Sequence, residues 1–286
     1  MKSRLIGQRT VSAIGLGGMP MSIEGRPDRE RSVRTIHAAL DAGVTLIDTA
    51  DAYHLYADEV GHNESLIAEA LASSSVDAAD VIIATKGGHL RPGDGSWNLD
   101  GRPEHLKQAA QSSATRLGVE AIGLYQFHRP DPNVPYAESV GALADLLDDG
   151  TIQMAGISNA GVDQIREASD VLGGRLASVQ NQFSPAVRKA RDELVLCDEL
   201  GVAFLPWSPL GGIRRASQLG DQHGAYGDVA RAHDVSPQQV ALAWHLAQSP
   251  HVIPIPGASR PETILDSLAA AELTLSDDEL LRLDAD

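Results

Sequence analysis

The sequence predicts an α/β fold and, within that class, a (β/α)8 barrel of eight parallel strands surrounded by helices. Three observations predict it. Short apolar runs alternate with helical patterns along the chain, which is typical of a parallel sheet with helical crossovers. No linker or shift in composition divides the 286 residues, so we expect one domain over residues 1–286. Polar residues follow the apolar runs, and in a barrel the loops after the strands share one rim.

The first element expected is a short hairpin, in which residues 4–6 and 10–11 flank a turn at Gly7. The apolar runs expected to form the barrel strands follow this hairpin. Their bounds are 13–18, 44–47, 81–85, 122–127, 152–157, 176–179, 202–205 and 252–255. Eight such runs without an interruption favour closure into a barrel over an open sheet.

Helices are expected between the strands, because apolar residues recur there at helical spacing. Their bounds are 30–41, 64–73, 103–117, 137–148, 162–172, 189–200, about 227–232, 237–248, 261–271 and a last helix after Ser276. Pro103 suits a first helical turn, and Gly150 and Gly173 are typical stop signals. Four loops exceed the usual few residues, and long loops in a compact domain are usually functional. These loops are 19–28, 50–62, 87–101 and 208–227.

Composition restricts the class of function. The formal net charge of −16 argues against nucleic acids and anionic membranes as partners, because both bind basic surfaces. The single cysteine, Cys197, lies in an apolar helical segment, so we expect a buried structural thiol. The first residues lack the apolar core of a signal peptide, and no run reaches the roughly 20 apolar residues of a membrane span. These features predict a cytoplasmic protein.

Four residues near predicted strand ends form a candidate catalytic cluster: Asp48, Tyr53, Lys86 and His128. Reduction of a carbonyl requires a hydride at carbon and a proton at oxygen. A tyrosine is normally too weak an acid near pH 7, but a nearby ammonium stabilises the phenolate and lowers the phenol pKa. A carboxylate keeps that ammonium charged, and a histidine can donate a hydrogen bond to the carbonyl oxygen. The cluster therefore predicts carbonyl reduction.

The motifs that carry these residues resemble those of the aldo-keto reductase superfamily. Residues 48–53 match its Asp-Thr-Ala-x-x-Tyr signature, residues 83–86 its lysine strand, and residues 124–131 its histidine strand. Residues 156–159 and 179–182 match its nicotinamide-binding motifs. The resemblance covers residues 4–283. It implies a TIM barrel with its active site at the C-terminal rim, which binds NADPH and reduces an aldehyde or ketone by direct hydride transfer.

The resemblance also implies roles for single residues. Tyr53 would be the proton donor, Lys86 and Asp48 would tune its acidity, and His128 would orient the carbonyl. Further residues would contact the coenzyme or the substrate. They are Ser158, Asn159 and Gln180 at the carboxamide, Trp207 on the nicotinamide ring, Ser208, Pro209, Leu210 and Gly211 around the pyrophosphate, and Met19 and Met21 at the pocket mouth. Trp97, in a long loop, is a candidate for the pocket wall.

We expect residues 257–267 to bind the phosphate groups at the adenosine side of the coenzyme, and we name this segment the phosphate end. A helix begins at residue 261, and the free N–H groups of a helix start attract phosphate. The guanidinium of Arg260 suits the adenosine 2′-phosphate, and Ser259 lies beside it. Gly257, Thr263 and Ser267 stand where many relatives carry Lys, Arg and Asn. We therefore expect NADPH as the coenzyme, and use of NADH remains open.

Two other classes of function are alternatives to a reductase. A Schiff-base aldolase would use Lys86 as its nucleophile, but it would leave Tyr53 and Arg260 without roles. A coenzyme-sensing module, like the potassium-channel β-subunits of this fold, would bind NADPH with little turnover.

The short chain and its Pro-Leu-Gly-Gly loop resemble bacterial members of the superfamily, which include pyridoxal reductases. Pyridoxal is thus a named candidate substrate among small aldehydes. We expect a monomer or a weak homo-oligomer. His54, His62 and His89 lack the paired spacing of a metal site, so they are interpreted as loop residues and no metal is expected.

Overall fold

Parallel strands form the centre of the computed structural model, which describes residues 2–212 and 215–286. Within these residues the central sheet has seven strands in the order β11-β10-β9-β8-β5-β4-β3. All neighbouring pairs in this sheet are parallel. The strands are β3 (Leu16–Gly17), β4 (Leu46–Asp48), β5 (Ile82–Gly87), β8 (Leu124–Phe127), β9 (Ala155–Ser158), β10 (Leu176–Gln180) and β11 (Ala203–Phe204).

Residues 252–257 close the sheet into a barrel, although they form single bridges rather than a regular strand. Phe204 pairs with Val252 on one side, and Gly17 pairs with Gly257 on the other. The N–H groups of Gly15 and Gly17 donate to the carbonyls of Pro254 and Pro256 at 3.0 and 2.9 Å. Proline has no N–H to donate, which explains why the strand predicted at 252–255 is not a continuous ladder. The predicted (β/α)8 barrel is confirmed, and its eighth strand is reduced to isolated bridges.

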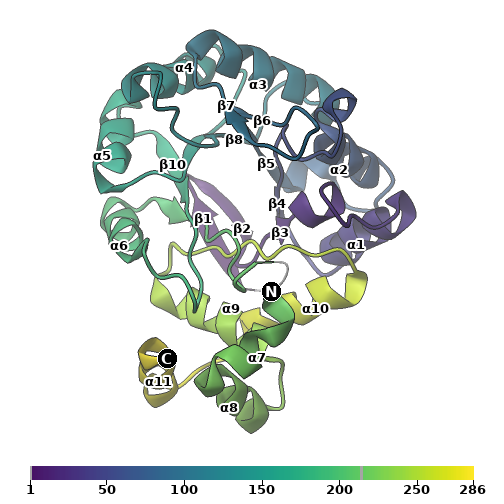
Figure 1. Cartoon of the computed structure of the whole chain (residues 1–286), viewed down its shortest axis with the longest axis vertical. Helices are drawn as coiled ribbons and strands as arrows, with labels where there is room; N and C mark the ends of the chain where they lie inside the picture. Colours follow the sequence, from purple (N-terminus) through teal and green to yellow (C-terminus); the bar gives the residue numbers. More distant parts are fainter. Residues whose placement is uncertain (1, 213–214) are drawn as a thin grey trace.

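The helices form a ring around the strands (Figure 1). They are α1 (Arg29–Asp41), α2 (His62–Ala72), α3 (Pro103–Leu117), α4 (Tyr136–Asp148), α5 (Val162–Val171), α6 (Arg191–Leu200), α7 (Leu219–Gln222), α8 (Gly224–His233), α9 (Pro237–Gln248), α10 (Pro261–Ala269) and α11 (Asp277–Ala285). Helix α10 packs against α1, which completes the ring, while α7, α8 and α11 project from it (Figure 1).

A hairpin of β1 (Ser3–Ile6) and β2 (Arg9–Ser12) precedes the barrel, as predicted. Its strands pair antiparallel, with Ser3 opposite Ser12 and Ile6 opposite Arg9. In Figure 1 the hairpin lies across the opening of the barrel. Ile6 and Val11 belong to the same buried cluster as the inward-facing strand residues, so the hairpin seals the end of the barrel at which the strands begin.

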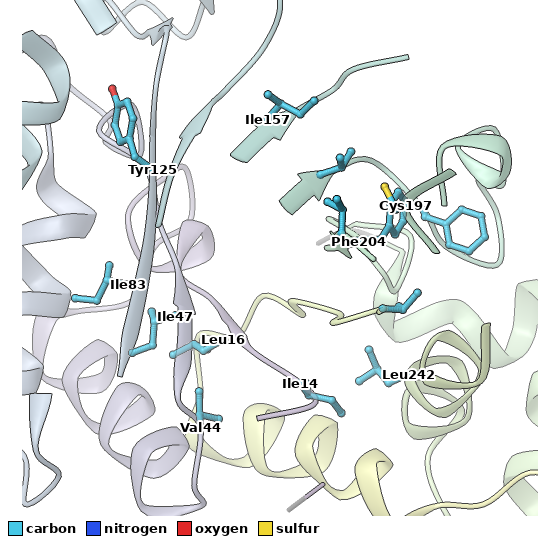
Figure 2. Close-up of a cluster of buried hydrophobic side chains, with 14 of the residues drawn as sticks. Ile14, Leu16, Val44, Ile47, Ile83, Tyr125, Ile157, Cys197, Phe204 and Leu242 are labelled. Carbon is cyan, nitrogen blue, oxygen red and sulfur yellow. The ribbon is translucent and has the colours of Figure 1, made fainter. Parts of the chain in front are cut away.

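Two apolar layers result from the alternation of side chains along each strand. Leu46, Ile82 and Leu124 lie in a cluster inside the barrel. Their neighbours Ile47 and Ile83 belong to a larger cluster between the sheet and the helices (Figure 2). Cys197 is fully buried in this outer layer, as predicted, and burial raises the pKa of its thiol to about 12.

The structure adds short elements inside all four long loops, including 3-10 turns at Met19–Met21 and Ala57–Glu59. Loop 87–101 contains a small hairpin of β6 (His89–Leu90) and β7 (Asn98–Leu99). Loop 208–227 contains the single-turn helix α7, and residues 213 and 214 of that loop lie outside the described residues. None of the helices in the described ranges has both the length and the apolar character needed to cross a membrane.

Candidate active site

The alternation that fills the barrel interior also aims polar side chains at its carboxyl-end rim. On β4, Leu46 faces inward, and Asp48 lies two residues later on the same face. On β5, Ala84 faces inward, and Lys86 follows at the same spacing. The inward-facing side chains of each strand are therefore apolar inside the barrel and polar at the carboxyl end of the strand. This places the two charges of the candidate catalytic cluster on neighbouring strands, where they meet.

Lys86 is fully buried and uses all three of its ammonium protons. Its Nζ donates to Asp48 Oδ1 at 2.7 Å, to the carbonyl oxygen of Thr49 at 2.7 Å and to the hydroxyl of Tyr53 at 3.3 Å. Because the phenol oxygen of Tyr53 accepts from Lys86, its own O–H proton remains available to another acceptor. Lys86 therefore orients Tyr53 as a hydrogen-bond donor toward the cavity that Tyr53 lines.

Asp48 has a partner for each carboxylate oxygen. Oδ1 accepts from Lys86, and Oδ2 accepts from Gln180 Nε2 at 2.7 Å. Burial by itself would lower the pKa of Lys86, but the charge of Asp48 and the neighbouring Tyr53 hold that pKa above its ordinary value. Lys86 is consequently a permanent cation at neutral pH.

The pKa of Tyr53 lies above its ordinary value of 10, because the effect of burial outweighs the lowering caused by Lys86. The net direction is opposite to the one expected from the ammonium alone. Tyr53 is thus a neutral phenol across the physiological range, held against a cation. A group in this state can donate a proton when a strong enough base, such as a developing alkoxide, forms beside it.

His128 completes the candidate catalytic cluster as a neutral ring. Burial, with smaller effects of His89, Lys86 and Arg129, holds the pKa of His128 well below 6.5. Its ring meets that of Tyr53 edge-on, with centroids 5.8 Å apart. His128 therefore offers a hydrogen bond without a charge.

A cavity of about 640 Å³ opens above the cluster. Its lining combines residues predicted from the sequence with residues that were not. The predicted ones are Met19, Asp48, Tyr53, Trp97, His128, Ser158, Asn159, Gln180, Trp207, Ser208, Pro209, Leu210 and Gly257. The others include Gly17, Pro20, His89, Leu99, Arg129 and Ile255. Lys86 lies behind the wall, and Met21, expected at the mouth, is instead 1% exposed in the outer apolar layer.

Ser158, Asn159 and Gln180 are brought together by the neighbouring strands β9 and β10. The Oγ of Ser158 donates to the carbonyl oxygen of Gln180 at 2.7 Å. Asn159 adopts the left-handed conformation with φ of 59°, and its Nδ2 donates to the carbonyl oxygen of His128 at 3.0 Å. Its Oδ1 accepts from Arg129 at 3.1 Å. The three residues thus line one wall of the cavity and are linked through Ser158 Oγ, which bonds the Gln180 backbone carbonyl and accepts from Asn159 Nδ2.

Trp207 begins the segment that borders the other side of the cavity. Its indole Nε1 is buried and meets no hydrogen-bond acceptor among the described residues. Ser208, Gly211 and Gly212 all have positive φ, which bends the chain tightly. His245 on α9 anchors this segment, because its Nε2 lies 3.0 Å from the carbonyl oxygen of Pro209. The sequence interpretation did not include His245, since a histidine inside an apolar helix carries no signal for a loop contact.

The phosphate end lies beside the rim but outside the cavity lining, apart from Gly257. Arg260 is exposed at the start of α10 and does not cap that helix with its side chain. Ser259 and Thr263 are half-buried, and Ser267 is buried. A Cβ at position 257 would lie 2.7 Å from Cγ of Pro20, so this close approach favours glycine there.

A second buried polar group, named here the rear cluster, lies on the other face of β5. It comprises Asp51, Glu64, Thr85 and Arg116. Glu64 accepts from Thr85 Oγ1 at 2.5 Å and from Arg116 Nε at 2.6 Å. Asp51 Oδ1 is buried and finds no partner among the described residues. Burial and the nearby Glu64 raise the pKa of Asp51 to about 8. The sequence interpretation missed this cluster, because its members come from four separate segments.

Fold and site together define the class of this protein, a (β/α)8 barrel with an oxidoreductase-type site at its rim. Residues 13–285 match the profile of the aldo/keto reductase family. An uncharacterized oxidoreductase of Schizosaccharomyces pombe is 35% identical over 98% of this chain and 88% of its own length. The 6-dehydroglucose reductase of Novosphingobium aromaticivorans is 34% identical over 92% of this chain and 87% of its own.

A solved structure agrees with these relatives. An aldo/keto reductase from Klebsiella pneumoniae, in complex with NADP and acetate, is 26% identical, with a TM-score of 0.82 over 99% of this chain and 94% of that one. The chain belongs to the aldo/keto reductase family and is an oxidoreductase.

Proposed function

We propose that this protein is an NADPH-dependent reductase that converts a small aldehyde or ketone to the alcohol. The observation that carries the proposal is the geometry at Lys86, whose buried ammonium bonds both Asp48 and the hydroxyl of Tyr53. This arrangement leaves one neutral phenol proton facing a cavity and places a fixed positive charge behind it. General acid catalysis at a carbonyl oxygen requires these two features.

The reaction follows from these positions. The carbonyl oxygen of the substrate accepts hydrogen bonds from Tyr53 and His128. When bound, NADPH supplies a hydride to the carbonyl carbon. As the C–H bond forms, the π electrons move to the oxygen, which takes the phenol proton of Tyr53 and becomes the alcohol hydroxyl. The phenolate left on Tyr53 is stabilised by Lys86, and a proton from solvent restores the phenol.

The residues of the rim fit a nicotinamide dinucleotide. Trp207 lines the cavity with an indole N–H that has no partner among the described residues, and Ser158, Asn159 and Gln180 form a polar wall of the same cavity. We assign these four to the nicotinamide and its carboxamide, and residues 208–211 to the pyrophosphate.

The phosphate end is assigned to the adenosine side of NADPH. Arg260 would bind the 2′-phosphate at the helix start, with Ser259, Thr263 and Ser267 beside it. Gly257 contributes space rather than a cation, so we leave NADH as an alternative coenzyme. The presence of NADP in the Klebsiella pneumoniae structure supports the assignment of the coenzyme.

Pyridoxal or another small aldehyde fits the size of the cavity, about 640 Å³. The name of the 34% identical relative, 6-dehydroglucose reductase, supports a carbonyl on a sugar-like compound as a further candidate. From the acidic composition and the single cysteine, we also propose a cytoplasmic protein that acts as a monomer or a weak homo-oligomer.

The geometry disfavours the Schiff-base alternative. A nucleophilic lysine needs a neutral, accessible amine, whereas the Nζ of Lys86 is buried, charged and bonded to three oxygens. The sensing alternative differs from the reductase only in turnover, so the same assay separates them. Binding of NADPH without oxidation across a broad panel of carbonyl compounds would favour a sensor.

The experiment is NADPH oxidation by the purified protein against aldehydes, ketones and pyridoxal, with NADH in parallel. We expect turnover with at least one aldehyde and a preference for NADPH. Binding is followed separately through quenching of tryptophan fluorescence, because Trp207 borders the cavity. Absence of both binding and turnover would contradict the proposed function.

A further inference from the structure

A second histidine lies beside His128 in the cavity, and the mechanism above gives it no role. His89 begins strand β6, and its ring centroid is 4.1 Å from that of His128. Its ring also approaches Trp97, with a centroid distance of 5.3 Å. All three side chains line the cavity together with Tyr53. Two imidazoles therefore stand next to each other where the reacting carbonyl would lie.

The nitrogen atoms of the two rings indicate what each can contact. In both His89 and His128, Nδ1 is buried and has no hydrogen-bond partner within residues 2–212 and 215–286. The other nitrogen, Nε2, is the atom that each ring can present to the cavity that both rings line. A polar atom held at a cavity wall without a protein partner is suited to bind a polar group of a ligand.

The charge of the site restricts that polar group. Burial, with Arg129 and Lys86 nearby, lowers the pKa of His89 to about 4, so the ring is neutral near pH 7. A neutral imidazole has one donor nitrogen and one acceptor nitrogen. A hydroxyl group both donates and accepts, so it can pair with Nε2 in either tautomer. A carboxylate only accepts, so it can pair with Nε2 in only one of the two tautomers.

His89 is held by a hairpin with contacts of its own. His89 pairs with Leu99 and Leu90 with Asn98 in the β6–β7 hairpin. Arg91 lies over the ring of Trp97, with its Cζ 4.8 Å from the ring centroid, and forms an ion pair with Glu24. These contacts fix the position of the hairpin and of His89 on it. A residue that discriminates between substrates needs such a fixed position.

We propose that His89 is a specificity-determining residue, which hydrogen-bonds a hydroxyl on the carbon next to the reacting carbonyl. The enzyme would then prefer 2-hydroxyaldehydes to simple aldehydes. His128 hydrogen-bonds the carbonyl oxygen. His89, whose ring packs against that of His128, hydrogen-bonds the oxygen on the next carbon of the substrate. Oxygens on neighbouring carbons lie about one hydrogen-bond length apart, so two imidazoles with centroids 4.1 Å apart can each bond one of them. The inference rests on the proposed carbonyl reduction and deepens it.

The test compares three aldehydes of equal carbon number: propanal, 2-hydroxypropanal and 3-hydroxypropanal. For the wild type we expect kcat/KM for 2-hydroxypropanal to exceed that for the other two about tenfold, as one added hydrogen bond allows. His89→Leu should remove this preference, measured as the ratio of kcat/KM for 2-hydroxypropanal to kcat/KM for propanal. This ratio is also compared between wild type and variant, and in that comparison the differences in aldehyde hydration cancel.

Two further variants separate a hydrogen bond from a merely structural role. The amide of a glutamine reaches the place of Nε2, whereas that of an asparagine reaches only the place of Nδ1. His89→Gln should therefore restore part of the preference for 2-hydroxypropanal, and His89→Asn should not. An unchanged preference in His89→Leu, or equal turnover of the two hydroxyaldehydes by the wild type, would overturn the inference alone. Absence of turnover with all three aldehydes, while pyridoxal or another carbonyl compound is reduced, would overturn the inference alone. Absence of turnover with every carbonyl compound would overturn the proposed reduction and the inference with it.

Discussion

At the catalytic end of the site, charges are buried and paired, whereas at the phosphate end the cation is exposed. Asp48 is 3% and Lys86 0% exposed, and they form a salt bridge at 2.7 Å inside the barrel. Arg260 is exposed at the start of α10, and no hydrogen bond or ion pair joins its side chain to the residues that the structure describes.

The difference has a physical reason. A group that must stabilise charge at one atom gains from low dielectric and fixed geometry, while a group that binds a phosphate can remain hydrated until the ligand arrives. Substitutions at the buried end should therefore change the chemical step or the stability of the fold. Substitutions at the exposed end should change only affinity.

The largest effect is expected for Tyr53→Phe. Loss of the phenol proton should lower kcat about 10²–10⁴-fold, the usual contribution of a general acid, because no other neutral donor is bonded to Lys86 among the described residues. NADPH binding, followed by tryptophan fluorescence, should be unchanged. Turnover at the wild-type rate would remove Tyr53 from the mechanism.

The next effect concerns stability. Lys86→Met leaves the carboxylate of Asp48 buried with only Gln180 as a side-chain partner, so the free energy of unfolding should fall by about 3–5 kcal/mol. Urea unfolding measures this change. The double variant Asp48→Asn/Lys86→Met has no unpaired charge and should recover part of the loss. A double variant less stable than Lys86→Met would mean that Asp48 stabilises the fold independently of Lys86.

A smaller, pH-dependent effect is expected at the rear cluster. The pKa of Asp51 is raised to about 8 in the folded state and is about 4 in the unfolded chain. Between these values the folded state binds more protons than the unfolded state, so this group contributes a stability that falls as pH rises.

Asp51→Asn mimics the protonated carboxyl and removes this dependence. Its unfolding free energy, relative to the wild type, should increase from pH 4 to pH 8 by a few kcal/mol, because a pKa displaced by about four units corresponds to at most about 5 kcal/mol. Asp58→Asn, an exposed change in the same loop, serves as the control and should track the wild type. A constant difference between Asp51→Asn and the wild type across this range would contradict the raised pKa.

The smallest effect is expected at the exposed end. Arg260→Ala should raise KM for NADPH about tenfold and leave KM for NADH unchanged, since only NADPH carries the 2′-phosphate. High salt should shrink the NADPH preference of the wild type by screening. Arg166→Ala, which removes an exposed charge on α5, is the control. Equal weakening of both coenzymes would place the 2′-phosphate elsewhere.

Much of the fold could be predicted because its signals are local. The helix at 103–117 matches α3, since a proline at its start and Gly118 after it define both ends. Most barrel strands begin one to three residues later than predicted, because apolar residues precede the first residue that pairs with a neighbouring strand. The last predicted strand does not form a regular ladder, because Pro254 and Pro256 have no N–H groups to donate. This signal is present in the sequence.

The grouping of Asp48, Lys86 and His128 follows from local pattern, because side chains two apart on a strand face the same way and parallel strands end on one rim. The acidity of Tyr53 does not follow from local pattern. Burial outweighs Lys86 in setting its pKa, and desolvation depends on everything that packs around a group. The contact of His89, interpreted as a loop residue, with His128 likewise depends on the packing of the whole chain, since it joins two loops whose conformations no local signal specifies.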